Sequence, residues 1–139
     1  MNTIQLTVNA TIGADLQKVW DAWTQPDDIT KWNFASDDWC CPNAENDLRT
    51  GGKYRARMEA KDGSFGFDFE AVYDEILMHQ KITYTMADGR QSTTTFKSNG
   101  TTTEVSTTFE AETTNPIDMQ QQGWQAILNN FKKYVERND

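Results

Sequence analysis

Residues 115–136 read NPIDMQQQGWQAILNNFKKYVE, and this segment carries the strongest signal for the fold of the chain. Asn115 suits a helix N-cap and Pro116 suits the first helical position, so we expect a helix of about five turns. Its apolar residues recur on one face: Ile117, Trp124, Ile127, Leu128, Phe131, Tyr134 and Val135. A helix with one broad apolar stripe must bury that stripe against another layer, which we expect to be a sheet.

The preceding part of the chain predicts that sheet. Glycine-containing turns separate short alternating segments, and such runs of hairpins form antiparallel sheets. The predicted strands cover residues 45–49, 53–60, 65–77, 81–86, 91–96 and 103–111. Within the third of these, Val72 and Ile76 have the opposite parity to the phenylalanines before them. We therefore expect a bulge near Ala71.

Two short helices interrupt the chain after its first strand. Residues 3–12 alternate polar and apolar and predict that strand. Asp15 suits the cap of one helix, Pro26 begins a second, and residues 33–44 are expected to form a loop. The chain is thus predicted to be one α+β domain, residues 1–139, with a curved antiparallel sheet of about six to seven strands wrapped around the long C-terminal helix. The space between sheet and helix is a candidate ligand pocket.

The composition narrows the classes of function. The 139 residues carry a formal charge of −8 and have a pI near 4.6, which disfavours binding to a nucleic-acid backbone. No apolar run reaches membrane length, and residues 1–10 alternate in polarity, so we expect neither membrane insertion nor a signal or transit peptide. The two cysteines are adjacent and provide no disulfide framework. We therefore expect a reducing, cytoplasmic setting.

The adjacent pair Cys40 and Cys41 raises the question of a metal or redox site. A zinc site needs about four ligands at suitable spacing, and the single histidine, His79, lies far along the chain in a predicted turn. No C-x-x-C motif is present. We therefore expect no metal site and no cofactor. Nearby acids such as Asp37 and Asp38 are expected to raise the thiol pKa values and to limit their reactivity.

The sequence contains no recognisable set of catalytic residues. There is no G-x-S-x-G motif, and the histidine has no obvious orienting partner. Asp68 and Glu70 share one face of a strand whose other face carries phenylalanines, so we expect both carboxylates to be solvated. A reversed register would instead direct both into the cavity as acid/base candidates. Arg49 is expected to brace a hairpin by contacting backbone carbonyls or Asp47.

Four segments together resemble the START-like (SRPBCC, birch-pollen-allergen-like) superfamily. They are VWDAWTQPDDITKW at 19–32, DLRTGGKYRARMEAKDG at 47–63, FEAVYDEI at 69–76 and QQGWQAILNNFKKYVE at 121–136. Within the superfamily they are similar to the group named after the activator of the heat-shock-protein ATPase. The resemblance implies a helix-grip fold around an internal cavity and the binding of apolar or amphipathic small molecules. It implies no common catalytic residues, and it assigns co-chaperone action to proteins with an additional N-terminal domain.

Aromatic and hydroxyl side chains supply the candidate ligand site. The predicted interior positions Ser92, Thr94, Thr103 and Thr107 suggest a pocket with some polarity, because buried hydroxyls need partners. Threonines are equally good strand formers, so both explanations stay open. Trp39, in the loop before the first hairpin, is a candidate lid. The expected cavity-lining residues are Trp39, Tyr54, Met58, Phe67, Phe69, Tyr84, Thr94, Phe96, Trp124 and Leu128.

The expected function is binding of a small apolar or amphipathic ligand between the helix and the sheet. One alternative is an enzyme that uses the cavity, as cyclases and hydratases of the superfamily do, and it requires a buried acid or arginine in the pocket. Another is a stress-related co-chaperone or protein-interaction module, which requires a large exposed apolar patch. A homodimer and a chaperone partner also remain as alternatives, and the chaperone partner is the less favoured of the two.

Overall fold

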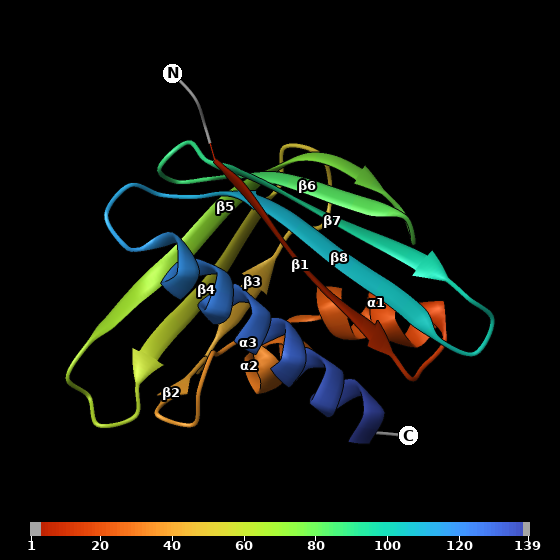
Figure 1. Ribbon diagram of the computed structural model, residues 1–139, viewed down its shortest axis with the longest axis horizontal. Coiled ribbons are helices and arrows are strands. Elements are labelled where there is room, and N and C mark those ends of the chain that lie inside the picture. The colour runs from red at the N-terminus through yellow and green to blue at the C-terminus, as the bar shows by residue number, and fades with distance from the viewer. Residues whose placement is uncertain (1–3, 138–139) are drawn as a thin grey trace.

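The chain folds as a curled antiparallel sheet packed on one long helix (Figure 1). The computed structural model describes residues 4–137. Its strands are β1 (Gln5–Ile12), β2 (Trp39–Cys40), β3 (Ala44–Asn46), β4 (Lys53–Ala60), β5 (Gly66–Leu77), β6 (Lys81–Met86), β7 (Gln91–Ser98) and β8 (Thr103–Glu110). Its helices are α1 (Leu16–Thr24), α2 (Pro26–Trp32) and α3 (Ile117–Arg137). None of these helices, within the described residues, has the length and apolar character of a membrane span.

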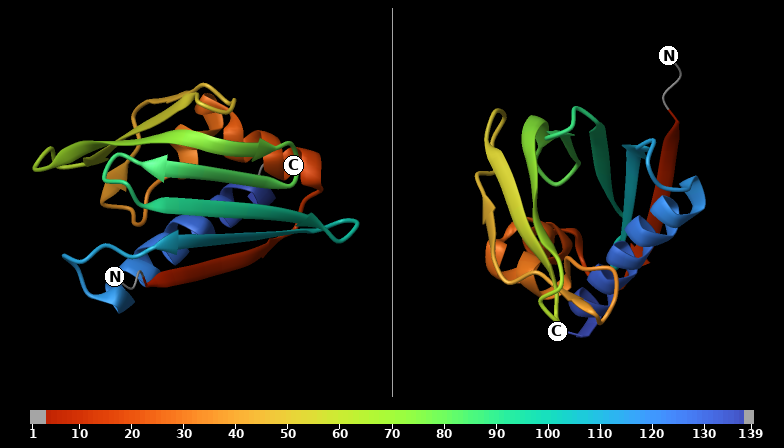
Figure 2. Two further views of the ribbon diagram at one scale, coloured as in Figure 1. Left: turned by 90° about the horizontal axis from the view of Figure 1, so that it is seen from above. Right: turned by 90° about the vertical axis from the view of Figure 1, so that its left-hand side faces the viewer.

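Consecutive hairpins build most of the sheet. The order across it is β1-β8-β7-β6-β5-β4-β2, and β3 also pairs with β4. Every pair is antiparallel. The first strand therefore lies beside the last, and the sheet curls into a half-barrel around α3 (Figure 2). The predicted α+β fold, with a long C-terminal helix and two short early helices, is confirmed.

The two early helices begin where the sequence predicts. Asp15 caps α1, because its Oδ1 accepts a hydrogen bond from the backbone N–H of Lys18 at 2.9 Å. Pro26 opens α2, at a position where no backbone N–H is needed. The buried Trp32 indole N–H donates to the carbonyl of Ala22 at 2.9 Å, and this bond holds α2 against α1.

Some predicted boundaries differ from those of the structure. Residues 33–44 are more than a loop, because the two residues of β2 and the first residue of β3 pair with β4. A strand of two residues has no readable periodicity. Helix α3 begins at Ile117, and the backbone N–H of Gln120 donates to the carbonyl of Pro116, which therefore precedes the first helical residue. Strand β1 contains most of its predicted range, although Thr3 lies outside the described residues.

The change of frame in β5 lies later than predicted. Pairing between β5 and β6 is regular as far as Tyr73 and resumes at Glu75, so the bulge is at Asp74 and not near Ala71. Val72 therefore belongs to the outer face, where its side chain is 43% exposed. Tyr73 takes the inward position and is buried. The bulge itself is confirmed, and its predicted position is wrong.

Helix α3 also lies along the edge of β1. The side chains of Gln121, Gln125 and Lys132 donate hydrogen bonds to backbone carbonyls of β1 at 3.2, 3.0 and 2.7 Å. The acceptors, in the same order, are Thr7, Asn9 and Thr11. Because donors and acceptors ascend together, the helix runs along the strand in the same direction.

Phe131 anchors α3 against the two early helices. Its side chain is fully buried and makes edge contacts with Trp23 and Trp32, with ring centroids 4.9 and 4.8 Å apart. The two indoles stack on each other with centroids 5.0 Å apart. This three-ring cluster (Trp23, Trp32 and Phe131) therefore joins all three helices.

Replacing Phe131 by alanine is expected to lower the free energy of unfolding by about 3–5 kcal/mol, because the lost ring leaves a cavity between the indoles. Chemical denaturation followed by circular dichroism measures the loss. The control, Lys133→Ala, changes an exposed residue of the same helix and should alter stability by less than about 0.5 kcal/mol. Similar losses in the two variants would contradict the anchoring role of the three-ring cluster.

Candidate functional site

A pocket of about 370 Å³ lies between α3 and the concave face of the sheet. All three helices and strands from both halves of the sheet contribute side chains to it. Its aromatic lining residues are Trp23, Trp32, Tyr54, Phe67, Phe69, Tyr73, Tyr84 and Trp124. The other lining residues are Val8, Asn33, Met58, Ile82, Arg90, Thr94, Thr107, Glu112, Ile127 and Leu128. The walls are therefore mainly aromatic and aliphatic, with a limited number of polar groups.

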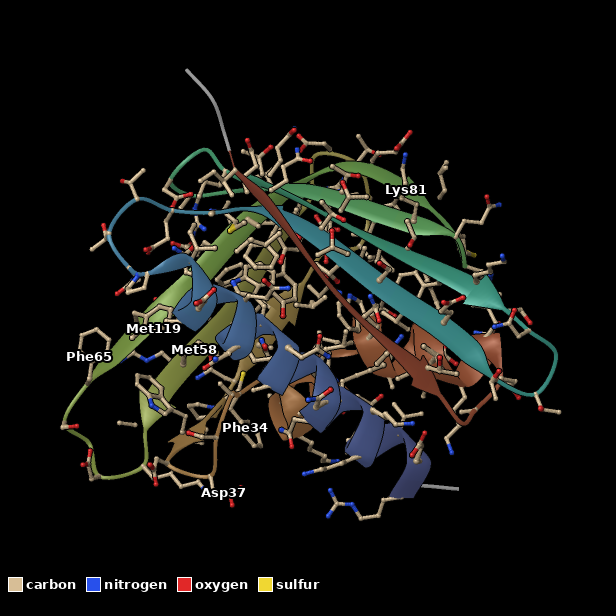
Figure 3. The ribbon with its side chains drawn as sticks, in the orientation of Figure 1. Phe34, Asp37, Met58, Phe65, Lys81 and Met119 are labelled. Carbon is tan, nitrogen blue, oxygen red and sulfur yellow. The ribbon has the colours of Figure 1, made fainter. Side chains whose placement is uncertain are left out.

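Apolar side chains are exposed near the β4–β5 hairpin. Phe67 lines the pocket and is 42% exposed, and Phe65 beside it is 60% exposed. Trp39 packs edge-on against both rings, with centroid distances of 6.0 and 6.2 Å. We call Trp39, Phe65 and Phe67 the apolar rim. Figure 3 shows Phe65 on the same side of the molecule as Met58 of β4 and the exposed Met119 at the start of α3.

Most of the residues expected to line a cavity come together in this pocket. They are Tyr54, Met58, Phe67, Phe69, Tyr84, Thr94, Trp124 and Leu128. The other two expected residues are not part of its lining. Trp39 belongs to the apolar rim, and Phe96 packs against Trp20 and Trp23 with centroid distances of 5.1 and 5.8 Å.

Several lining residues were not expected from the sequence. Tyr73 has the same parity as Phe69 in β5, so placing the bulge at Asp74 would have identified it. Arg90 and Glu112 reach the pocket from the β6–β7 turn and from the segment after β8. Turns and irregular segments have no periodicity from which the direction of a side chain can be read.

Three tyrosines meet in the pocket, and asparagines hold two of them. The Tyr54 hydroxyl accepts from Asn33 Nδ2 at 3.1 Å, and the Tyr73 hydroxyl donates to Asn46 Oδ1 at 2.5 Å. The rings of Tyr54 and Tyr84 are nearly parallel, with centroids 6.1 Å apart. Burial raises the pKa of all three phenols, to about 12 for Tyr84. They therefore remain protonated at neutral pH and keep a proton to donate.

The interior hydroxyls of β7 and β8 serve two different purposes. Thr103 donates to the carbonyl of Ala14 at 2.9 Å and so ties the start of α1 to the sheet. Thr94 Oγ1 and Thr107 Oγ1 share a hydrogen bond of 2.8 Å at the pocket surface. Ser92 Oγ is buried beside the Tyr84 hydroxyl and has no well-aligned hydrogen-bond partner among residues 4–137. The last three hydroxyls thus retain unused hydrogen-bonding capacity.

Two charged side chains line the pocket, and both have partners. Arg90 Nε donates to Asp88 Oδ2 at 2.8 Å, and Nη1 donates to the carbonyl of Glu110 at 3.0 Å. Glu112 Oε1 accepts from the backbone N–H of Asn115 at 2.5 Å. These contacts fix both side chains at the end of the pocket near the start of α3.

The carboxylates of β5 lie on its outer face. Asp68 is exposed and forms an ion pair with Arg55 at 3.3 Å. Glu70, two residues further on, is not among the lining residues of the pocket. The predicted contact of Arg49 with Asp47 is confirmed at 2.8 Å. Ion pairs as exposed as these contribute little stability and indicate a solvated face.

Both cysteines are free thiols. Cys41 is buried, and burial raises its pKa to about 11, with a smaller contribution from Cys40 and an opposing one from Arg55. The main cause is therefore burial and not the neighbouring acids that the sequence suggested. His79 lies in the predicted turn, with φ 65°. Residues 4–137 contain no group of three or more His, Cys, Asp or Glu side chains suited to hold a metal ion.

Comparison with known proteins identifies the family that has this architecture. Residues 14–136 match the family described as activator of Hsp90 ATPase homolog 1-like protein. The chain belongs to this family. The family is part of the START/SRPBCC superfamily, whose fold generally binds ligands. The resemblance noted in the sequence is thus confirmed.

Solved structures of relatives share the fold over nearly the whole chain. An AHSA1-like protein from Aeromonas hydrophila is 41% identical with a TM-score of 0.91, and the match covers 96% of this chain and 93% of that chain. A protein from Cytophaga hutchinsonii is 47% identical with a TM-score of 0.83 and the same coverage. A protein from Nitrosomonas europaea, 14% identical with a TM-score of 0.82, shares the fold alone, over 96% of this chain and 95% of that chain. No curated protein matches the chain.

The Cys40→Ala variant tests the thiol chemistry, because it leaves Cys41 as the single cysteine. With a pKa of about 11, Cys41 has far less thiolate at neutral pH than free cysteine. We expect alkylation by iodoacetamide on the order of a hundredfold slower than that of free cysteine, measured by mass spectrometry. Unfolding in urea should restore the ordinary rate. A fast reaction of the native variant would show that Cys41 is accessible and ionised.

Alkaline titration tests the buried phenols. Burial raises the pKa of all four tyrosines: Tyr54, Tyr73, Tyr84 and Tyr134. The unfolded chain loses phenolic protons near pH 10. The free energy of unfolding should therefore be unaffected by tyrosine below about pH 10 and fall as the pH rises toward 12. Urea denaturation measures this decrease in the free energy of unfolding. The Tyr84→Phe variant should show a smaller decrease. Tyrosinate absorbance in the native protein with a midpoint near pH 10 would contradict the burial.

Proposed function

We propose that the protein binds a small apolar or amphipathic molecule in the pocket between α3 and the sheet. The observation that carries this proposal is the pocket itself, with its volume of about 370 Å³ and its aromatic walls. Small-molecule sites are typically concave, on the order of 300–1,000 Å³, and mainly apolar with a few polar groups. The ligand-binding tendency of the SRPBCC fold supports the same function.

The apolar rim supports entry of the ligand beside the β4–β5 hairpin. Phe67 belongs both to the rim and to the pocket lining, so a ligand that passes it stays in contact with apolar surface. Trp39 lies against Phe67 from β2, where a small movement of the indole changes the access to the pocket. Exposed aromatic groups at a pocket mouth are typical of sites that take up apolar molecules from water.

An enzyme built on the same pocket has weaker support. General acid–base catalysis needs a side chain that exchanges a proton with the bound molecule near the working pH. Arg90 and Glu112 line the pocket, but their hydrogen bonds are directed to the protein itself. The Tyr54 and Tyr84 phenols stay protonated, because burial raises their pKa values. We therefore assign the pocket to binding.

A substitution that fills the pocket tests this function. Ile127 of α3 lines the pocket and is half-buried, so Ile127→Trp adds an indole to the space for the ligand. We expect it to weaken the binding of the neutral fluorescent probe N-phenyl-1-naphthylamine at least about tenfold. Asn129→Trp adds the same ring at an exposed position of the helix and is the control. Equal affinities in the two variants, or no saturable binding to the unmodified protein, would contradict the proposal.

A further inference from the structure

The sheet floor of the pocket carries a hydroxyl patch, formed by Tyr84, Ser92, Thr94 and Thr107. The strand register pairs Tyr84 with Ser92, and Thr94 with Thr107, so the four side chains lie on neighbouring positions of β6, β7 and β8. Ser92, Thr94 and Thr107 are each at most 4% exposed. Tyr84, Thr94 and Thr107 line the pocket directly.

The hydrogen-bonding capacity of this patch is only partly used. Thr94 and Thr107 bond to each other, which uses one of their two hydroxyl protons. Ser92 Oγ lies beside the Tyr84 hydroxyl, with which it interacts, but it has no well-aligned hydrogen bond in the described part of the chain. Tyr84 stays protonated, because burial raises its pKa to about 12, although hydrogen bonding with Ser92 and the charge of Arg90 lower it. A buried hydroxyl whose proton is poorly used costs free energy, so a ligand that supplies a hydrogen-bond acceptor would stabilise the patch.

The charges around the pocket favour a neutral acceptor over a carboxylate. Among the described residues, Arg90 is the single cationic side chain in the lining, and it already contacts Asp88 and the carbonyl of Glu110. Glu112 adds a negative charge to the same lining. A ligand carboxylate would lose its water of hydration close to the negative charges of Asp88 and Glu112. It would gain no unpaired cation in return. A carbonyl oxygen accepts two hydrogen bonds and carries no net charge.

We propose that the pocket selects apolar molecules with a neutral carbonyl oxygen, and that the hydroxyl patch binds this oxygen. The inference rests on the proposed ligand-binding function and adds the chemistry and the position of the ligand's polar end. The apolar body then lies between the patch and the apolar rim, along Phe69, whose ring centroid is 6.0 Å from that of Tyr84. The polar end of the ligand therefore contacts hydroxyl groups, and its apolar end contacts the aromatic side chains of the rim.

Three naphthalene derivatives of nearly equal size test the inference on the full chain. 2-Acetylnaphthalene carries the neutral carbonyl, 2-isopropenylnaphthalene has a methylene group in place of the oxygen, and 2-naphthoate carries a charged carboxylate. Thr94→Val and Ser92→Ala each remove one hydroxyl of the patch with little change in volume. Thr95→Val changes an exposed residue of the same strand and is the control. Dissociation constants are measured by NMR titration.

Each patch variant is expected to bind the ketone about three- to tenfold more weakly, the effect of one lost hydrogen bond. The alkene should bind the same variants at least as well as it binds the unmodified protein, which shows that the pocket is intact. Thr95→Val should change neither affinity. Unchanged ketone affinity in both patch variants, or tighter binding of naphthoate than of the ketone, would overturn the inference and leave the proposed function standing. Failure of all three compounds to bind the unmodified protein would overturn both.

Discussion

Burial of the apolar stripe of α3 is the constraint on which the rest of the structure depends. The helix is held at two positions in its middle part, Trp124 and Phe131. Toward its C-terminus Phe131 inserts between the indoles of α1 and α2, and nearer its start Trp124 stacks on Phe109 of β8 with centroids 3.9 Å apart. Between these two anchors the helix spans a sheet that curves away from it. The pocket lies between the helix and the curled sheet, with Leu128 on its helical wall.

The same side chains provide both packing and pocket walls. Trp23 and Trp32 contact Phe131 and also line the pocket. A bound ligand would therefore contact the cluster that joins the three helices. Ligands that bind only the folded state raise its stability by mass action, so occupancy of this pocket and stability of the domain are linked.

The sequence predicts those parts of the fold that repeat with a regular period or carry a local signal. The stripe of α3, the cap at Asp15 and the alternation that turns Tyr54 inward are all of this kind. Strand β2 could not be predicted, because two residues contain no period and pair with β4 only through long-range contacts. The bulge is at Asp74 and not near Ala71, so the inward direction of Tyr73 was not predicted and this residue is missing from the expected lining. Arg90 reaches the pocket from a turn, where spacing says nothing about direction.

The hydrogen bonds between α3 and β1 limit where a second copy of the chain can add a strand to the sheet. An open sheet edge is a template on which a second chain can add a strand, and long exposed edges promote aggregation. Gln121, Gln125 and Lys132 occupy carbonyls along β1 that such a strand would need. The helix therefore blocks the pairing of a further strand with β1. A dimer that extends the sheet would instead form at the opposite edge, where β2 and β3 offer two and three residues for pairing.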